Sequence, residues 1–441
     1  MRKIPLIAIV GRPNVGKSTL FNKIVGKRVS IVEDFEGVTR DRVYCDGEWC
    51  GKAFTLIDTG GLDIKSEDIM WSHIRAQAEI AVDIADAIIF VVDGKSGITT
   101  NDREVANFLR KSQKPVVIAA NKLDGSDTDN MFDFYEFGFD NVIATSAEHG
   151  IGVGDLLDEV LSKFDYNEIE QDTDVLKIAI VGKPNAGKSS LTNKILGQER
   201  VIVSDIAGTT RDAIDTPFEF EGKKCKIIDT AGIRKKASVD KGIEQYSVLR
   251  SLAAIREADV VLIVVDSFDG FTEQDTKICG YVHEQMKPSV VVMNKWDMIE
   301  KDTFTVDKFN AYLKQELNFM DYFVPVYISA KTGQRVDKVL KTAFEVYEEA
   351  SKRVQTGILN DVIADAIVAV EPPSTHGRRL RVYYATQAQT NPPVFILFVN
   401  DETLMHFSYM RYLENTLRKA FVFRGTPIKI VTRSRKEDEE K

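Results

Sequence analysis

Two glycine-rich octapeptides of the form G-x-x-x-x-G-K-S lie 171 residues apart in this chain of 441 residues: GRPNVGKS from Gly11 to Ser18, and GKPNAGKS from Gly182 to Ser189. Each follows a short apolar run that is typical of a buried parallel strand. Glycine lets backbone N–H groups approach phosphate oxygens, and the helix that begins there adds the positive end of its dipole. The chain is therefore predicted to fold around two phosphate-binding loops.

Four further motifs recur in the same order after each octapeptide. In first and second copy they are GVTRD (37–41) and GTTRD (208–212), DTGG (58–61) and DTAG (229–232), NKLD (121–124) and NKWD (294–297), and Ser146-Ala147 and Ser329-Ala330. One such match arises by chance far more easily than five ordered matches that occur twice. The repeated order therefore favours two complete nucleotide sites over a purely structural origin.

The hydrophobic pattern predicts three domains. In both repeats apolar runs alternate with helical patterns, which predicts an α/β fold with a mostly parallel sheet and flanking helices, and the motifs fall at the carboxyl edge. After residue 351 a helix, two strands, a helix and a strand predict a small α+β domain. The predicted division is 1–163 (first P-loop domain), 164–175 (acidic linker), 176–351 (second P-loop domain), 352–436 (basic α+β domain) and 437–441 (acidic tail). Whether the linker lets the domains rearrange or is only a solvated connector stays open.

Charge separates the last domain from the rest of the chain. Residues 352–436 hold 13 Lys or Arg and 6 Asp or Glu, a net charge of +7, whereas the whole chain carries −9. A basic module on an acidic chain indicates a surface that faces nucleic acid. The alternative is a merely solvated basic face. The candidate phosphate contacts are Arg378, Arg379, Arg381, Arg411, Arg418 and Lys419.

Other classes of protein are disfavoured by the composition. The longest apolar runs, such as 87–92 and 260–265, are too short to cross a bilayer, and no signal-peptide pattern opens the chain. The four cysteines show neither zinc-site spacing nor a disulfide framework. His73 is interpreted as a surface residue rather than a catalytic base. We therefore expect a cytoplasmic protein that has no membrane contact.

The first three motifs supply the groups that act on phosphate. Lys17 and Lys188 are predicted to reach the β- and γ-phosphates. Mg²⁺ is predicted to bind the hydroxyls and carboxylates at matching positions of the two copies, namely Ser18, Thr39 and Asp58 in the first and Ser189, Thr210 and Asp229 in the second. Thr209 is a less favoured alternative to Thr210. The N–H groups of Gly61 and Gly232 are predicted to sense the γ-phosphate.

N-K-x-D decides which base is bound. A carboxylate at Asp124 or Asp297 accepts from N1–H and the exocyclic amine of guanine, whereas adenine offers an acceptor and leaves a charge unpaired. GTP is therefore favoured over ATP. Asn121 and Asn294 would brace the loop, Lys122 and Lys295 would lie along the base, and the backbones at Ser146-Ala147 and Ser329-Ala330 would contact the base oxygen. The predicted phosphate-loop contacts are completed by Gly11, Asn14, Val15, Gly16, Thr19, Gly182, Asn185, Ala186, Gly187 and Ser190.

These ordered motifs resemble the Era-like GTPases, and two such domains followed by a small basic domain resemble the bacterial Der (EngA) family. The resemblance covers nearly the whole chain. It implies a KH-like third domain and a monomeric, nucleotide-controlled switch that hydrolyses GTP to GDP during assembly of the large ribosomal subunit. By the same resemblance, the third domain faces ribosomal RNA or another domain.

The chain departs from related patterns at two places. A GXXG loop is typical of RNA-binding KH domains, yet Gly357, Gly377 and Gly425 do not form one. Leu62 and Ile233 stand where small GTPases often place a water-orienting Gln. Relatives with this replacement use K⁺ beside the phosphates, which the resemblance would place at Asn14 and Asn185.

Two rival hypotheses address the same motifs. One is an RNA-binding assembly factor in which one P-loop domain is only a structural or regulatory nucleotide site. The other is a tRNA-modifying GTPase with a single P-loop domain inserted in a helical domain and a cysteine near its C-terminus. The second rival does not fit, because Cys279 is the last cysteine of this chain.

Overall fold

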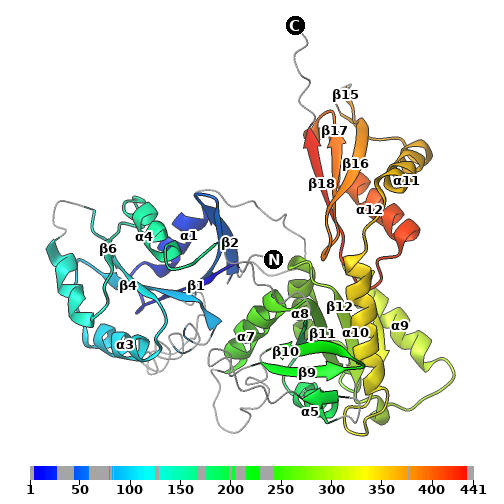
Figure 1. Ribbon diagram of the computed structural model, residues 1–441, viewed down its shortest axis with the longest axis horizontal. Helices are drawn as coiled ribbons and strands as arrows, with labels where there is room; N and C mark the ends of the chain where they lie inside the picture. The colour runs from blue at the N-terminus through cyan, green and yellow to red at the C-terminus, as the bar shows by residue number, and fades with distance from the viewer. Residues whose placement is uncertain are drawn as a thin grey trace. The chain divides into compact units, whose positions relative to one another are not determined.

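The computed structural model describes residues 4–26, 44–58, 79, 82, 84–124, 129–166, 175–197, 201–203, 215–228, 243–375 and 378–434. The chain divides into two compact units. The first holds Met1–Thr173 with Val239–Leu249, and the second holds Asp174–Ser238 with Arg250–Lys441. Figure 1 shows the fold and labels many of the helices and strands.

The first unit is built on a six-stranded sheet in the order β2-β3-β1-β4-β5-β6, which is parallel except for β2. Its strands are β1 (Leu6–Val10), β2 (Tyr44–Trp49), β3 (Lys52–Asp58), β4 (Ala87–Asp93), β5 (Val116–Asn121) and β6 (Val142–Ala144). Its helices are α1 (Lys17–Val25), α3 (Thr100–Lys111), the 3₁₀ helix η3 (Asp129–Phe137) and α4 (Val153–Leu161).

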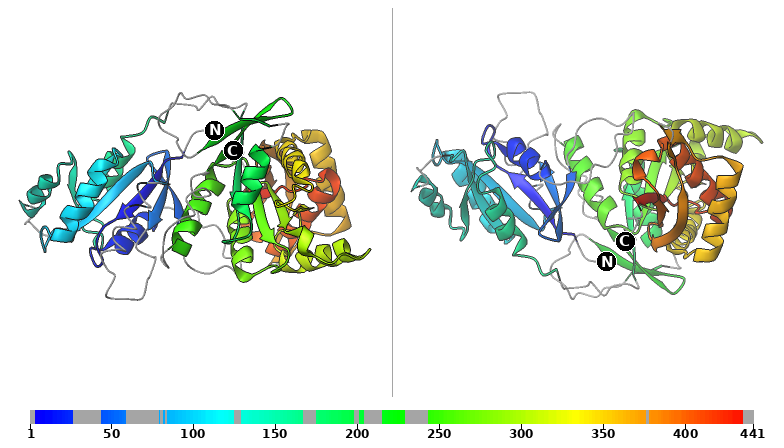
Figure 2. Two further views of the ribbon diagram at one scale, coloured as in Figure 1. Left: turned by 90° about the horizontal axis from the view of Figure 1, so that it is seen from below. Right: turned by 90° about the horizontal axis from the view of Figure 1, so that it is seen from above.

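Helices cover both faces of this sheet. Leu20 of α1 and Leu156 of α4 pack in one buried cluster, and Leu109 of α3 and Phe134 of η3 pack in a cluster on the opposite face. Figure 2 shows these layers from two directions, in blue to cyan. Strand β4 has seven consecutive buried residues, as expected of a central parallel strand between two helical layers.

The second unit begins with a sheet of seven strands in the order β13-β12-β11-β7-β10-β9-β8. Its strands are β7 (Leu176–Val181), β8 (Val201–Val203), β9 (Thr216–Phe220), β10 (Lys223–Ile228), β11 (Val260–Asp266), β12 (Ser289–Asn294) and β13 (Pro325–Tyr327). Its helices are α5 (Lys188–Leu196), the part of α7 (Ile243–Glu257) from Arg250 onward, α8 (Glu273–Glu284), η4 (Trp296–Met298), α9 (Thr305–Glu316) and α10 (Val336–Ser351). The predicted fold of two P-loop domains is thus confirmed. Before the last strand of the sheet, the second domain has α9 where the first domain has η3.

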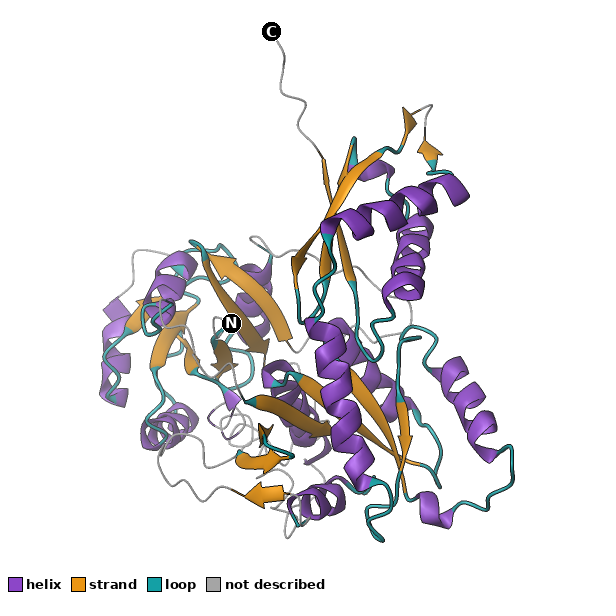
Figure 3. Cartoon of the chain, turned by 45° about the vertical axis from the view of Figure 1, so that its right-hand side comes forward, coloured by secondary structure: helices purple, strands orange, loops and turns teal. Residues whose placement is uncertain are grey.

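The predicted α+β domain completes the second unit. It contains α11 (Thr356–Ala369), β14 (Ser374–Thr375), β15 (Arg378–Arg379), β16 (Val382–Gln389), β17 (Val394–Val399), η5 (Glu402–Leu404), α12 (Phe407–Phe421) and β18 (Lys429–Ser434). Strands β16, β17 and β18 form a three-stranded sheet. Figure 3 shows both helices on one side of that sheet, where their leucines pack against Phe395 and Leu397.

Backbone hydrogen bonds fix this domain to the second P-loop domain. The Ser289 N–H donates to the Gly425 carbonyl at 2.8 Å, and the Gly425 N–H donates to the Tyr322 carbonyl at 2.9 Å. Gly425 has φ +68°, and a Cβ there would collide with the Val346 side chain, so the contact requires glycine. Arg418, a predicted phosphate contact, instead lies 4.6 Å above the Tyr322 ring with its side chain only 10% exposed.

Among the described residues, no helix is long and apolar enough to cross a bilayer.

Candidate nucleotide-binding sites

Both phosphate loops join a central strand to a helix, β1 to α1 and β7 to α5. Gly16 and Gly187 begin these helices with φ of +94° and +102°. A Cβ on either glycine would collide with the side-chain amide of Asn121 or Asn294, respectively. The second glycine of each octapeptide is therefore needed both for its backbone conformation and for close approach of the N-K-x-D loop.

The two P-loop lysines lie inside their loops. Lys17 Nζ donates to the carbonyls of Gly11 and Arg12 at 2.8 and 2.9 Å. Lys188 Nζ donates to the equivalent carbonyls of Gly182 and Lys183 at 2.6 and 2.9 Å. Burial lowers the pKa of Lys17 to about 8, and the nearby Asp58 carboxylate partly opposes this shift. Each ammonium group thus lies against the loop that would surround the phosphates.

A buried asparagine ties three loops together in each site. Asn121 is 2% exposed; its Nδ2 donates to the Val15 carbonyl at 2.8 Å, and its Oδ1 accepts from the Ala147 N–H at 2.9 Å. Asn294 makes the same two contacts in the second site. There Nδ2 donates to the Ala186 carbonyl at 2.8 Å and Oδ1 accepts from the Ala330 N–H at 2.9 Å. The bracing role predicted for both asparagines is the one that their contacts support.

The adjacent lysine links the phosphate loop to the end of the central strand. Lys122 Nζ donates to the Asn14 carbonyl at 2.7 Å and pairs with the Asp93 carboxylate at 2.7 Å. Desolvation alone would raise the pKa of Asp93, but the hydrogen bond from Lys122 and those from two backbone N–H groups outweigh it and lower that pKa. In the second site Lys295 pairs with Asp266 in the same way.

The two aspartates predicted to read the base have different neighbours. Asp124 lies 2.9 Å from Lys95 Nζ and 3.7 Å from His149 Nε2, and the hydrogen bond from Lys95 is the main cause of a lowered pKa at Asp124. At Asp297 a hydrogen bond from Ser329 is the main cause of the lowered pKa. Both carboxylates are therefore ionised near neutral pH and can accept from a guanine edge.

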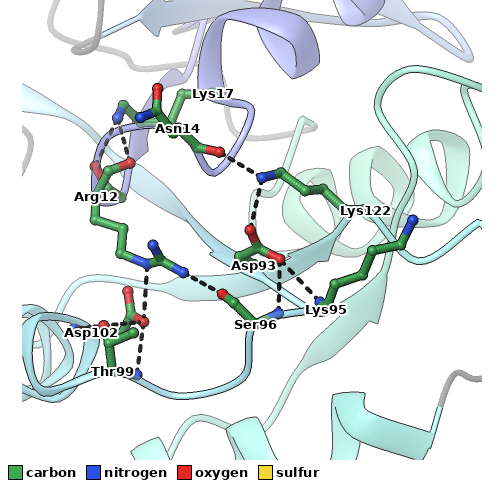
Figure 4. Close-up of polar contacts among 10 residues, drawn as sticks. Arg12, Asn14, Lys17, Asp93, Lys95, Ser96, Thr99, Asp102 and Lys122 are labelled. Carbon is green, nitrogen blue, oxygen red and sulfur yellow. Dashed lines mark hydrogen bonds and ion pairs between the residues drawn. The ribbon is translucent and has the colours of Figure 1, made fainter.

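A further network lies behind the first phosphate loop, as Figure 4 shows. The Arg12 guanidinium lies 3.4 Å from the Asp102 carboxylate and donates to the Ser96 hydroxyl at 2.5 Å. Asp102 also accepts from the N–H and hydroxyl of Thr99 at 3.1 and 2.7 Å, which forms the capping box of α3. The N-terminus of α3 thereby holds the second residue of the phosphate loop.

The second site repeats this network with a different cation. Lys183 Nζ lies 3.7 Å from the fully buried Asp275, which accepts from the N–H and hydroxyl of Thr272 at 3.0 and 2.6 Å. Motif reasoning missed both networks. The signal was nevertheless present, because D-x-x-x-G-x-T-x-x-D occurs at 93–102 and again at 266–275.

Two predicted Mg²⁺ ligands of the first site are described. Ser18 lies exposed in the first turn of α1, and Asp58 ends β3, is 6% exposed and interacts with the charge of Lys17. Ser189 has the place of Ser18 in α5. A hydroxyl and a carboxylate are the hard oxygen donors that Mg²⁺ prefers, so these residues fit the ion. Five predicted residues lie outside the described part of the chain: Thr39, Gly61, Thr210, Asp229 and Gly232.

Comparison with known proteins matches all three parts of the chain. Residues 6–122 and 177–295 match the family described as 50S ribosome-binding GTPase. Residues 353–433 match the family described as the C-terminal KH-domain-like part of EngA bacterial GTPase enzymes. Fold and sites thus define a tandem P-loop GTPase with a KH-like third domain.

Relatives extend this match to the full chain. GTPase Der of Acetivibrio thermocellus is 54% identical over 98% of this chain and 99% of its own. GTPase Der of Clostridium perfringens strain SM101 is 55% identical over 98% of this chain and 99% of its own. The chain belongs to the GTPase Der family of GTP-hydrolysing enzymes, as its tandem motifs predicted.

Proposed function

We propose that both sites bind and hydrolyse GTP, and that their nucleotide state controls binding of the KH-like domain to the large ribosomal subunit and its rRNA. The chain would act as a cytoplasmic monomer. The observation that carries this proposal is the duplicated set of contacts made by Asn121 and Asn294, which joins the same three loops in each repeat. It supports two competent sites over one catalytic and one structural site. The family description supports the ribosomal partner.

The chain's own groups would position and stabilise the phosphates. Lys17 and Lys188 would exchange loop carbonyls for the β- and γ-phosphates, and backbone N–H groups at the start of α1 and α5 would bind phosphate oxygens. In the first site Ser18, Asp58 and Thr39 would hold Mg²⁺, which would supply positive charge to the phosphates. In the second site the corresponding ligands would be Ser189, Asp229 and Thr210.

K⁺ is proposed as a second cation near the phosphates. Asn14 and Asn185 are exposed at the tip of each loop in left-handed backbone conformations, with φ of +65° and +63°. Their side-chain oxygens are free of the packing that confines Asn121 and Asn294. Hydrolysis should therefore be faster in KCl than in NaCl at equal ionic strength, and Asn14→Ala or Asn185→Ala should reduce the difference. Equal rates in both salts would remove K⁺ from the proposal.

Strand β12 offers a short path from the second site to the KH-like domain. Its first residue, Ser289, donates to the Gly425 carbonyl, and its last residue, Asn294, braces the nucleotide loops. The two contacts lie on one six-residue strand. A conformational change at the second nucleotide site would therefore be transmitted along β12 to the KH-like domain.

The proposal is tested with variants that give each site a different nucleotide. Asp124→Asn and Asp297→Asn present an amide donor where a carboxylate accepted, which should shift the altered site from guanine to xanthine. Co-sedimentation with large subunits is then measured with GDP, GTP and non-hydrolysable guanine and xanthine analogues. The proposal is contradicted if neither the guanine nor the xanthine analogue changes subunit binding. It is also contradicted if the GTP affinity of both variants equals that of the unaltered protein. Turnover from one site alone would favour the rival RNA-binding factor with one structural site.

A further inference from the structure

The three-stranded sheet of the KH-like domain has helices on one face only. Alternate strand residues, among them Phe395 and Leu397, pack against Leu359 of α11 and Leu413 of α12 in one buried cluster. The residues between them point to the other face, as the alternation of a strand requires. Within the described part of the domain, no helix packs on that second face, which we call the open face (Figure 3).

The open face carries several aromatic and apolar side chains. Strand register places Tyr384 beside Phe398 and Val431 beside Ile396. The rings of Tyr384 and Phe398 stack with centroids 4.4 Å apart and an angle of 13° between their planes. Tyr384 remains 45% exposed. A sheet face that only meets water normally carries polar side chains, so this composition indicates a ligand that has flat, apolar surfaces.

All the formal charge on these strands is positive. Arg433 lies beside Phe398 in the strand register, and Lys429 lies beside Val394. Both side chains belong to exposed residues, and β16, β17 and β18 contain no Asp or Glu. Stacked rings next to cations are the combination that binds single-stranded nucleic acid, because bases stack on the rings while phosphates pair with the cations.

We propose that the open face of β16, β17 and β18 binds single-stranded RNA. A base stacks on Tyr384, and the neighbouring phosphate pairs with Arg433. This inference rests on the proposed function, which brings the domain to rRNA, and it supplies a binding surface in a domain whose glycines form no GXXG loop. It also differs from the basic residues singled out from sequence, because Arg433 and Lys429 were not among them.

The test measures binding of a fluorescein-labelled single-stranded oligoribonucleotide of about 12 nucleotides to the full-length protein by fluorescence anisotropy. Tyr384→Ala should weaken binding about fivefold or more, because it removes a stacking partner. Tyr384→Phe keeps the ring and should bind like the unaltered protein. Arg433→Glu should weaken binding and reduce its salt dependence.

Lys419→Glu is the matched control for Arg433→Glu. Lys419 is one of the candidate phosphate contacts named from the sequence, but it is an exposed residue of α12, which packs on the opposite face of the sheet. Its replacement makes the same change in charge, so the two variants compare the two faces of the domain. It should weaken binding less than Arg433→Glu does. Unchanged GTP hydrolysis in every variant will show that the fold is intact.

Three results would overturn the proposal. The first is Tyr384→Ala binding the oligonucleotide as tightly as the unaltered protein. The second is an equal loss for Arg433→Glu and Lys419→Glu, which would indicate diffuse attraction by charge. The third is an unaltered protein that binds no oligonucleotide but still co-sediments with large subunits according to nucleotide. That result refutes the open-face site and leaves the proposed function standing. If the unaltered protein instead fails to bind large subunits in every nucleotide state, the proposed function is refuted.

Discussion

The two nucleotide sites share the contacts that shape their loops and differ in the side chains around them. Asn121 and Asn294 make the same pair of hydrogen bonds, with distances that agree within 0.1 Å. By contrast, the second loop residue is Arg12 in one site and Lys183 in the other. The loop after the central strand carries Lys95 in the first site and Phe268 in the second. The comparison shows that the contacts that brace the loops are duplicated, whereas the side chains around the loops differ between the sites.

The largest expected effect tests whether the duplicated chemistry is real. Lys17→Ala or Lys188→Ala removes the cation predicted to reach the β- and γ-phosphates and should lower turnover at the altered site about 10²- to 10³-fold. Single-turnover hydrolysis, measured with the other site occupied by a xanthine nucleotide, separates the two sites. If one variant abolishes all hydrolysis and the other has no effect, the symmetry of the sites does not extend to catalysis.

The pH dependence of GTP binding at the first site is the next largest effect. Because burial lowers the pKa of Lys17 to about 8, the nucleotide-free lysine loses its charge as pH rises through that value. Phosphate binds the charged form, so GTP affinity should fall about tenfold between pH 7 and pH 9. Calorimetric titration of Asp297→Asn with GTP isolates the first site. Lys17→Arg keeps its charge over this range, so any binding it retains should show no such fall. A flat profile in the protein with Lys17 would refute a lowered pKa.

Much of each site could be predicted because its residues follow one another within short motifs. The strand, loop and helix around Lys17 are contiguous, and the N-K-x-D loop ends the strand adjacent to β4, so parallel-sheet geometry brings these groups together. The same reasoning gave the P-loop domains and the α+β pattern of the last domain. The pairing of Arg12 with Asp102 joins residues 90 positions apart, and it depends on how closely the start of α3 approaches the phosphate loop.

Two other features depended on packing that no local pattern encodes. Arg418 was expected to contact phosphate, yet it stacks on Tyr322 and pairs with Glu414 at 2.9 Å. Arg418 also lies 3.8 Å from Asp321, so its face of α12 meets the second P-loop domain. The segment before the last strand also differs between the repeats, with η3 in the first and α9 in the second. Tertiary context outweighs local propensity in such connections.

Replacement of the capping-box aspartate Asp102 should have the third largest effect on activity. Asp102→Asn weakens the hold of α3 on Arg12 while keeping an oxygen for Thr99, and should lower kcat/KM at the first site about fivefold. Arg12→Met should have a similar effect, whereas Arg12→Lys copies the second site and should retain activity. Arg103→Ala is the control, because Arg103 lies on the same helix as Asp102 and the change removes only an exposed ion pair with Glu136 of η3. If Asp102→Asn matches this control, the capping box serves only the helix.

The smallest expected effect concerns the difference between Lys95 and Phe268. Lys95 pairs with an oxygen of Asp124 at 2.9 Å, and guanine would need that carboxylate for N1–H and the exocyclic amine. Lys95→Ala should therefore free Asp124 and raise the guanine affinity of the first site by about two- to fivefold, since exposed ion pairs are weak. High salt should reduce the gain because it already screens the pair.

Phe268→Ala provides the matched change in the second site. Phe268 is 61% exposed and has no charge with which to compete for Asp297, so its replacement should leave the salt dependence of guanine binding unaltered. Guanine affinity is measured for both variants by calorimetric titration at low and high salt, with the other site converted to xanthine. Should Lys95→Ala weaken guanine binding instead, Lys95 assists the nucleotide rather than competing with it. The two sites would then differ in how they bind the base, and not only in whether a lysine pairs with the base-reading aspartate when no nucleotide is bound.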